Sequence, residues 1–279
     1  MKINWFPGHM TKALRTMEKE IKTIDFVIYV LDARAPKSSV NPKFQELIGG
    51  KPIIYVLNKI DLADDKVTDE FRKYFTNKNS ICLALNCTQS GIISKIDSAA
   101  KTLCAGKIEK YRAKGLTAIL RCMVLGVPNS GKSTLVNNLC GVGRAVTGNK
   151  PGVTKGKQWV RVTPTFEVLD TPGTLWPSFS EEWQGEDLAL VGSIRDEVFD
   201  VSELALVLIE KLQKLYPNAL SLRYNINTQD KTTLEIYEDI AAAKKFMLRG
   251  GEVDYERTAK MIVDDFRKTR LGKITLERI

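Results

Sequence analysis

One short stretch, "GVPNSGKST" at residues 126–134, constrains the fold of this chain more than any other. It has the spacing Gly126-x4-Gly131-Lys132-Ser133, follows an apolar run of strand length and opens a helical pattern. A strand, a glycine-rich turn and a helix in this order form a phosphate-binding loop. Glycines let backbone N–H groups face phosphate oxygens, and the helix N-terminus adds positive potential. The stretch therefore predicts a nucleotide-binding α/β domain.

The side chains of this loop have separate expected roles. Lys132 is expected to neutralise the β and γ oxygens and so to be catalytic, and Ser133 is expected to give Mg²⁺ a hydroxyl ligand. Ser130 and Thr134 complete the expected nucleotide contacts. An ordinary glycine-rich turn is the alternative, and roughly one chain in a hundred would match the motif by chance. The strand before the loop and the helix after it make such a chance match rarer still.

Two later segments carry groups that can serve the γ-phosphate and the metal. Asp170-Thr171-Pro172-Gly173 ends an apolar run, so Asp170 can reach Mg²⁺ through water while the Gly173 amide faces the γ-phosphate. Thr154, in the basic segment "KPGVTKGKQW", can give Mg²⁺ a second hydroxyl and take part in catalysis. Asp-x-x-Gly is expected about once per chain by chance, and loop threonines are common. The place of Asp170 at the end of a predicted strand supports its assignment.

The quartet Asn58-Lys59-x-Asp61 indicates which base is bound. A carboxylate at Asp61 accepts hydrogen bonds from N1–H and the 2-amino group of guanine, whereas adenine offers no donors at that edge. A carboxylate left unpaired would disfavour adenine by ~10⁴-fold or more. GTP and GDP are therefore the expected ligands, and Asn58 and Lys59 are expected to help to hold them.

Apolar runs of strand length recur through the first two-thirds of the chain, and polar or helical stretches separate most of them. Strands that alternate with helices argue for a mostly parallel sheet covered on both faces. Before them, apolar residues at helical spacing predict an amphipathic helix from about Thr11 to Ile24. The predicted strands are 26–32, 52–58, 81–86, 119–126, 158–162 and 166–170.

From about Pro177 the pattern becomes purely helical, with three apolar stripes at helical spacing. The expected architecture is a P-loop α/β domain over residues 1–176, which includes the N-terminal helix, followed by a small all-α domain over residues 177–279. The stripes consist of Val201, Leu204, Leu208, Leu212 and Leu215, then Ile236, Ile240 and Ala243, then Ala259, Ile262, Val263 and Phe266.

The net charge of +9 gives the chain a positive field, which would attract nucleic acid or an anionic membrane. A soluble protein with a basic surface would have the same composition. The clustering of the basic residues favours a partner that carries phosphate groups, because residues 144–161 carry five Lys or Arg and no acid. The segments "KIEKYRAKG" and "RKTRLGK" are also rich in basic residues.

Composition also bounds the compartment and the metal chemistry. No apolar run reaches membrane-spanning length and no signal-peptide pattern is present, so the chain is expected to be cytoplasmic without stable membrane association. The five cysteines show no Cys-x-x-Cys spacing and are expected to be reduced core residues. With a single histidine, no zinc ligand set is evident, so any metal is expected to be held by oxygen.

Together these segments resemble one known family, the circularly permuted GTPases. The resemblance covers nearly the whole chain and depends on "WFPGHMTKA", "DARAP", "NKID", "GVPNSGKST", "PGVTKG", "DTPG" and the helices from "LALVGSI" onward. One departure is Asn86-Cys87, where GTPases generally carry Ser-Ala; the backbone amides of this segment are still expected at the guanine O6. The resemblance implies a monomeric GTPase that uses Mg²⁺. It also implies that immature large ribosomal subunits and their ribosomal RNA are its partners.

In the ordinary guanine-nucleotide-binding fold the phosphate loop precedes the base-reading quartet. Here the order is reversed, because the quartet at 58–61 precedes the phosphate loop. Sites at the carboxyl ends of strands in one sheet can converge whatever order the chain visits them in. The permuted chain leaves the sheet just after Gly173 and enters the helical region. A loop ordered by the γ-phosphate can then bias the orientation of the C-terminal helices, which would couple GTP and RNA affinities reciprocally.

Intrinsic hydrolysis is expected to be slow, because Thr174 stands where many relatives of this fold carry a water-orienting glutamine. His9, beside the Pro7-Gly8 turn, can act as a catalytic residue ordered by the ribosome, or it can be a surface or RNA-contacting residue. Asn129 matches the position that coordinates K⁺ in related GTPases, and a turn-stabilising role is its alternative. Both pairs of interpretations stay open.

The leading hypothesis is a GTPase that times a late maturation step of the large ribosomal subunit and its own release. One alternative is a nucleotide-gated RNA-binding scaffold whose hydrolysis is incidental. Another is a GTPase that acts in a different RNA process or at a membrane. A small-molecule kinase would fit the phosphate loop alone, but the Asn-Lys-x-Asp quartet argues against it.

Overall fold

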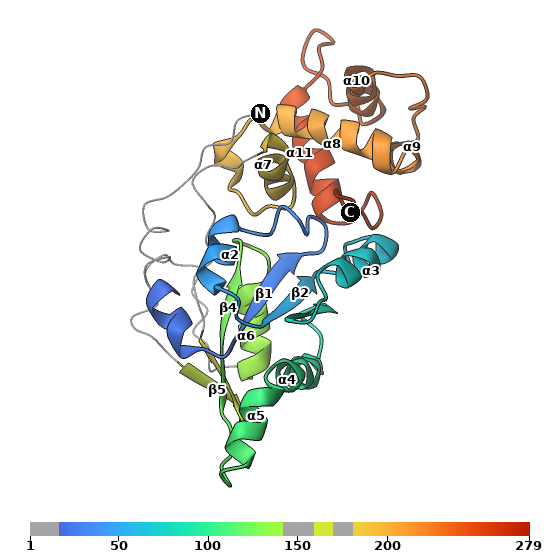
Figure 1. The fold of residues 1–279 in the computed structure, drawn as a ribbon. Coiled ribbons are helices and arrows are strands. Elements are labelled where there is room, and N and C mark those ends of the chain that lie inside the picture. Colours follow the sequence, from blue (N-terminus) through green and yellow to red (C-terminus); the bar gives the residue numbers. More distant parts are fainter. Residues whose placement is uncertain (1–16, 142–158, 170–180) are drawn as a thin grey trace.

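The computed structural model of the chain describes residues 17–141, 159–169 and 181–279. A six-stranded sheet with the order β3-β2-β1-β4-β6-β5 forms its centre (Figure 1). All neighbouring strands are parallel except the pair β5 and β6, which is antiparallel. The six predicted strands are thus confirmed, each within two residues at either end. They are β1 (Phe26–Asp32), β2 (Ile53–Asn58), β3 (Ser80–Ala84), β4 (Leu120–Gly126), β5 (Trp159–Thr163) and β6 (Phe166–Leu169).

The central strands form because both of their faces are buried. Every residue of β1 and β2 is buried, and both strands are rich in β-branched and aromatic residues. Side chains alternate between two apolar layers: Phe26, Ile28 and Val30 belong to one, and Val27 and Tyr29 to the other. Helices α4 (Ile92–Leu103) and α6 (Lys132–Cys140) cover the first layer, and α2 (Pro42–Ile48) and α3 (Asp65–Tyr74) cover the second.

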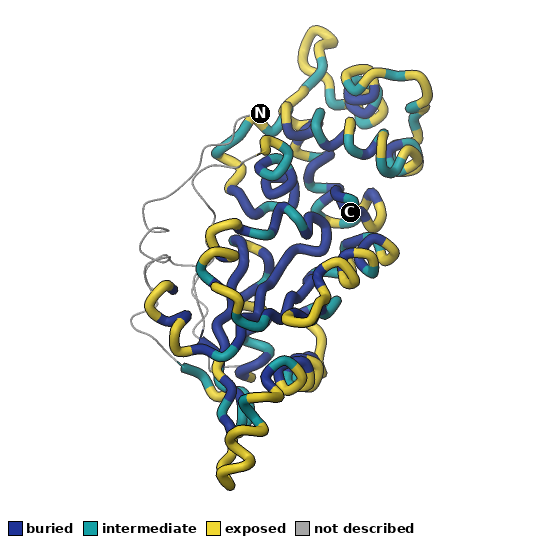
Figure 2. The backbone as a smooth tube through the Cα atoms, viewed as in Figure 1, coloured by how far each residue is buried: buried dark blue, intermediate teal, exposed yellow. Residues whose placement is uncertain are grey.

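One helix of this domain buries no side chain. Helix α5 (Ala105–Arg112) projects from the base of the domain, and residues 109–117 are all exposed (Figures 1 and 2). The basic segment "KIEKYRAKG" begins within this helix and continues three residues past its end. Its first turn is held by Lys107, whose ammonium contacts the Asp25 carboxylate at 2.7 Å.

The N-terminal helix lies partly outside the described residues. Residues 17–20 are helical and continue as a 3-10 turn over Ile21–Thr23. Met17 and Ile21 are buried against the sheet layer that contains Tyr29, as the apolar stripe predicts.

The C-terminal region is all helical, as predicted, and packs around α8 (Figure 1). Leu204, Leu208 and Leu212 are buried along one face of this helix. Asp200 begins it by accepting hydrogen bonds from two amides of the first turn. In the second predicted stripe Ile236 and Ile240 are buried but Ala243 is exposed, because the buried face of α10 includes Tyr237 and Ala241 instead. The elements are α7 (Glu182–Leu190), a 3-10 turn (Asp196–Val198), α8 (Val201–Leu215), α9 (Ala219–Tyr224), α10 (Thr233–Ala243) and α11 (Tyr255–Arg267).

The helical region and the sheet domain share a core. Ala35, just after β1, and Val127, in the phosphate loop, are fully buried in the same apolar cluster as Leu188 and Leu208. The division of the chain near residue 176 into two domains stays a prediction, and the boundary between the two is a packed interface.

A C-terminal segment, residues 274–277, lies against the loops that follow β1 and β2. The amide of Leu276 donates to the Arg34 carbonyl at 2.8 Å. The Glu277 carboxylate accepts from the amides of Lys37 and Ser38 at 2.5 and 2.9 Å. These loops are therefore packed between the sheet and the C-terminal segment.

Two compositional expectations can be compared with the structure. All five cysteines are buried and unbridged, as predicted, and burial raises the pKa of Cys82 and of Cys87 to about 12. Among the described residues, no helix combines the length and apolar character that crossing a bilayer requires.

Candidate nucleotide site

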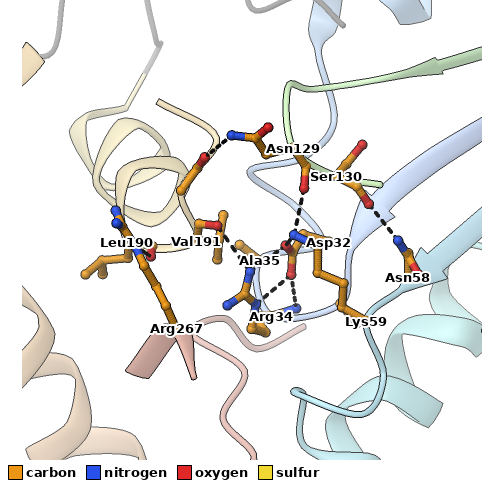
Figure 3. Close-up of polar contacts among 12 residues, drawn as sticks. Asp32, Arg34, Ala35, Asn58, Lys59, Asn129, Ser130, Leu190, Val191 and Arg267 are labelled. Carbon is orange, nitrogen blue, oxygen red and sulfur yellow. Dashed lines mark hydrogen bonds and ion pairs between the residues drawn. The ribbon is translucent and has the colours of Figure 1, made fainter. Parts of the chain in front are cut away.

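The carboxyl ends of β2 and β4 bring the base-reading quartet and the phosphate loop together. The Asn58 side chain joins them. Its Nδ2 donates to the Ser130 carbonyl at 2.8 Å (Figure 3), and its Oδ1 accepts from the Cys87 amide at 2.9 Å. Asn58 is 4 % exposed, so these bonds are sheltered from water. Three segments that are far apart in the sequence therefore form one site in the permuted order.

The backbone of the phosphate loop requires its two glycines. Gly126 has φ +153°, and a Cβ there would lie 2.5 Å from the Val30 carbonyl oxygen. Gly131 has φ +98°, and a Cβ there would lie 2.1 Å from Nδ2 of Asn58. Side chains at these positions would displace β1 or the Asn58 bridge. The close approach of loop and strands that a phosphate cradle needs is therefore present.

Lys132, Ser133 and Thr134 form the first turn of α6. Ser133 and Thr134 are exposed, so their hydroxyl groups can face a ligand. Lys132 is buried and its Nζ donates to the Val127 carbonyl at 2.8 Å. The Lys132 ammonium has three N–H donors, so it can bind phosphate oxygens while it keeps this bond to a carbonyl of its own loop.

The base-reading residues differ in their exposure. Asp61 is exposed beyond the end of β2, where its carboxylate can accept hydrogen bonds from a base. Lys59 has φ +63°, and its ammonium lies 2.7 Å from both the Asn129 carbonyl oxygen and Oδ2 of Asp32. Lys59 thereby ties the base-reading quartet to the phosphate loop a second time.

The segment expected at the guanine O6 lies beside Asn58, but its amides have other partners in this structure. The Cys87 amide donates to Asn58, and the Thr88 amide donates to Oδ1 of Asn86 at 2.9 Å. Asn86 closes a local turn in this way. A contact from this segment to guanine stays a prediction, and one made by the Cys87 or Thr88 amide requires that the hydrogen bond of that amide be shared or exchanged.

The remaining predicted site residues, His9, Thr154, Asp170 and Gly173, lie outside the described residues. Of the predicted magnesium ligands, the structure therefore describes only Ser133, whose exposed hydroxyl is the oxygen donor that Mg²⁺ prefers. Among the described residues no group of three His, Cys, Asp or Glu side chains could hold a metal ion.

A buried charged cluster beside the site was not foreseen from spacing or composition. Asp32 ends β1, is fully buried, and binds Arg34 at 2.8 Å and Lys59 at 2.7 Å. Burial by itself would raise the pKa of Asp32, but the charges and hydrogen bonds of Arg34 and Lys59 hold it well below its usual range. The available signal was an acid at the end of an otherwise apolar strand, followed two residues later by an arginine.

Comparison with known proteins agrees with this geometry. A family model described as "50S ribosome-binding GTPase" matches residues 121–248. Ribosome biogenesis GTPase A of Bacillus cereus is 39 % identical over 99 % of this chain and 94 % of its own length. The protein of the same name from Priestia megaterium is also 39 % identical, over 99 % and 97 %. Mouse mitochondrial ribosome-associated GTPase 1 is 33 % identical, over 98 % and 90 %.

Solved structures share the fold. A GDP-bound structure of TM YlqF superposes with a TM-score of 0.65 at 24 % identity, covering 95 % of this chain and 99 % of its own. A GNP-bound YlqF from T. maritima superposes with a TM-score of 0.63 at 25 % identity, over 96 % and 98 %. Since the curated relatives match along almost their entire length and the permuted motifs assemble one site, the chain belongs to the ribosome biogenesis GTPase A family of circularly permuted GTPases.

Proposed function

We propose that this GTPase binds immature large ribosomal subunits and uses GTP hydrolysis to time a late maturation step and its own release. The names of the relatives and of the family model support ribosomal particles as partners. The observation that carries the nucleotide part of the proposal is the Asn58 side chain, which bridges the phosphate loop and the Cys87 segment. One pocket can then contact guanine and phosphates at the same time.

The roles of the site residues follow from their chemistry. Asp61 reads guanine, while the amides of the phosphate loop and the Lys132 ammonium hold the phosphates. Ser133, together with Thr154 and Asp170, would hold Mg²⁺, which neutralises charge on the β and γ oxygens. The Gly173 amide would sense the γ-phosphate.

Hydrolysis in this proposal depends on residues supplied or ordered by the ribosome. His9 orients or activates the attacking water once the particle orders its segment. We expect His9→Ala to keep GTP binding and to lose particle-stimulated turnover, measured as phosphate release with and without large subunits. Stimulated turnover at the normal rate would remove His9 from the mechanism.

Asn129 is the candidate ligand for a potassium ion that bridges the phosphates and supplies positive charge during hydrolysis. Its side-chain Oδ1 is the atom that can coordinate a cation. Turnover measured in matched potassium and sodium chloride buffers tests this role. Equal rates in the two salts would leave Asn129 with only a structural role.

Ribosomal RNA is the proposed contact on the particle, because the chain carries a net charge of +9 and its basic residues are clustered. The helices after residue 177 and the exposed α5 are the parts proposed to meet RNA. The protein is proposed to act as a monomer in the cytoplasm.

Sedimentation of cell extract through a sucrose gradient tests partner and direction together. With a non-hydrolysable GTP analogue the protein should migrate with large-subunit precursors, and with GDP it should remain at the top. Migration that does not depend on the nucleotide would contradict the proposal. A variant that binds GTP without hydrolysing it should stay trapped on particles, whereas normal assembly in its presence would favour the scaffold alternative.

A further inference from the structure

The carboxyl-terminal end of α7 lies against the phosphate loop (Figure 3). The four carbonyls of residues 189–192 accept hydrogen bonds from side chains of three separate segments. Arg267 on α11 donates to the first two, Arg34 after β1 donates to the third at 3.1 Å, and Asn129 donates to the fourth at 2.7 Å. The last carbonyls of a helix lack partners within it and carry partial negative charge. Two guanidinium groups and one carboxamide thus hold this helix end.

Arg34 and Asn129 are also linked to each other through Asp32 and Lys59. Arg34 Nη2 donates to Oδ2 of Asp32 at 2.8 Å, and Lys59 Nζ donates to the same oxygen at 2.7 Å. Lys59 Nζ donates in addition to the Asn129 carbonyl at 2.7 Å. The contacts close a ring that runs from Asn129 through Lys59, Asp32 and Arg34 to the end of α7 and back. We call it the junction ring.

Two of the three charged members of the junction ring are buried, and the third, Lys59, is 23 % exposed. Asp32 is fully buried and Arg34 is 3 % exposed. A buried charge left without its partner costs far more than an exposed one, so these members keep their contacts when neighbouring segments shift. Packing adds to the link, because Val127 of the phosphate loop is fully buried in the core of the C-terminal helices. The loop and α7 are therefore held together by hydrogen bonds and by apolar contact.

We propose that the junction ring couples occupancy of the phosphate loop to the position of α7, and that Arg34 is the positioning residue at its centre. The proposal rests on the nucleotide site proposed above. Phosphates that bind the loop amides and the Lys132 ammonium pull on the loop backbone on both sides of Asn129, because Lys132 is also bound to the Val127 carbonyl. That change reaches α7 through the Asn129 carboxamide and through Lys59, Asp32 and Arg34.

The link works in both directions. A partner that displaces α7 removes hydrogen bonds from Arg34 and Asn129 and so changes the affinity of the loop for phosphates. This contact route is separate from the covalent one, in which the segment around Gly173 leads into α7. It needs no change in residues 170–180 to transmit a signal.

Hydrogen exchange measured by mass spectrometry tests the coupling on the full chain. In the unaltered protein, saturating GDP should change the exchange rate of peptides that cover residues 186–195. Allosteric couplings are typically about 5- to 150-fold, and we expect a change of at least about fivefold. GDP bound with no change in these peptides would overturn the proposal.

Arg34→Gln and Arg267→Gln form a matched pair of variants. Each removes a guanidinium from the end of α7, but the hydrogen bonds that Arg267 makes to described residues go to α7 and Asp196 and lie outside the ring. Arg34→Gln should reduce the GDP-induced change to less than about twofold, against the 5-fold lower end of typical couplings. Arg267→Gln should raise the exchange rate of these peptides with and without GDP alike. The ratio of the two rates should therefore stay the same. A ratio of the unaltered size in Arg34→Gln would overturn the proposal.

Arg34→Lys keeps the positive charge beside Asp32 and serves if the glutamine variant fails to fold. A lysine cannot bind Asp32 and the Val191 carbonyl with the same fork of donors, so the ratio should again fall. An unchanged ratio in this variant would also overturn the proposal.

GDP affinity is titrated separately by fluorescence. Absence of GDP binding in the unaltered chain would contradict the proposed function, whereas binding without a response at 186–195 contradicts the coupling alone.

Discussion

Replacing Asp32 by asparagine tests whether burial, rather than the distance between the charges, decides how much an ion pair contributes to the stability of the fold. The Asp32 carboxylate contacts Arg34 and Lys59 at 2.8 and 2.7 Å and is fully buried. Asparagine has nearly the same shape but is neutral, and one of its two terminal groups is a donor that would face another donor. The substitution therefore leaves the Arg34 guanidinium, 3 % exposed, without its counter-charge.

The expected loss follows from this uncompensated charge. Removing one partner of a buried ion pair typically costs about 3–5 kcal/mol, which changes the unfolding equilibrium by roughly a hundredfold to a few thousandfold. Total stabilities of proteins are about 5–15 kcal/mol. Asp32→Asn should therefore remain folded at 25 °C with a much lower urea midpoint.

Asp69 on α3 provides the control, since its carboxylate also contacts two cations, Arg72 and Lys73, at 2.6 and 2.8 Å. Its side chain is 45 % exposed, and exposed pairs contribute little to stability. Asp69→Asn should leave the urea midpoint almost unchanged at pH 7. Equal losses in the two variants, or no loss in Asp32→Asn, would refute the argument from burial.

The pH dependence of stability gives a second comparison, between the unaltered chain and Asp32→Asn. Arg34 and Lys59 overcome the effect of burial and depress the pKa of Asp32. An acid whose folded pKa is depressed stabilises the fold above its unfolded pKa of about 4, and this contribution is lost as the pH falls below that value. The stability difference between the unaltered chain and Asp32→Asn should be constant from pH 7 to pH 5 and should shrink below about pH 4. A difference that grows on acidification would contradict the sign.

Three further predictions concern single positions. Gly131→Ala should abolish binding of a fluorescent GDP, because its Cβ would displace Asn58. Gly115→Ala is the control, since Gly115 also has positive φ but a Cβ there would meet no atom within 4 Å, and this variant should bind GDP normally. Equal affinities of the two variants would contradict the geometry. Burial raises the pKa of Asp187 above its usual range although the Lys211 ammonium lies 2.8 Å away, so stability should fall as the pH rises above the unfolded pKa of about 4. Asp187→Asn should flatten this slope in urea titrations. Asp61→Asn should shift preference from GDP toward xanthosine diphosphate, whose 2-carbonyl accepts from the new amide, and competition binding that still favours GDP would argue against Asp61 as base reader.

The strands could be predicted because burial on both faces leaves a direct mark on the sequence. Continuous apolar runs such as 26–32 and 53–58 cannot alternate when both sides are covered. The antiparallel pairing of β5 and β6 was also marked, since only Pro164 and Thr165 connect the strands and no crossover fits in two residues.

The phosphate loop and the base-reading quartet were predictable because their chemistry is carried by residue types at fixed spacing. The junction with α7 was not, because Arg34, Asn129 and Arg267 bind backbone carbonyls, and any residue can supply a carbonyl. The buried partner of Arg34 is an acid only two positions away, a pairing that sequence alone cannot distinguish from a solvated turn.

Residues 274–277 are synthesised long after the loop after β1, yet they close over it. Glu277 and the Lys37 amide that it binds are separated by 240 positions. Domains generally fold from the N-terminal end as they leave the ribosome, but here the loop after β1 lacks its cover until translation of residue 277. A nascent chain can assemble strands and phosphate loop early, while the surroundings of Asp32 and Arg34 are completed only after α7 to α11 and residues 274–277 have emerged.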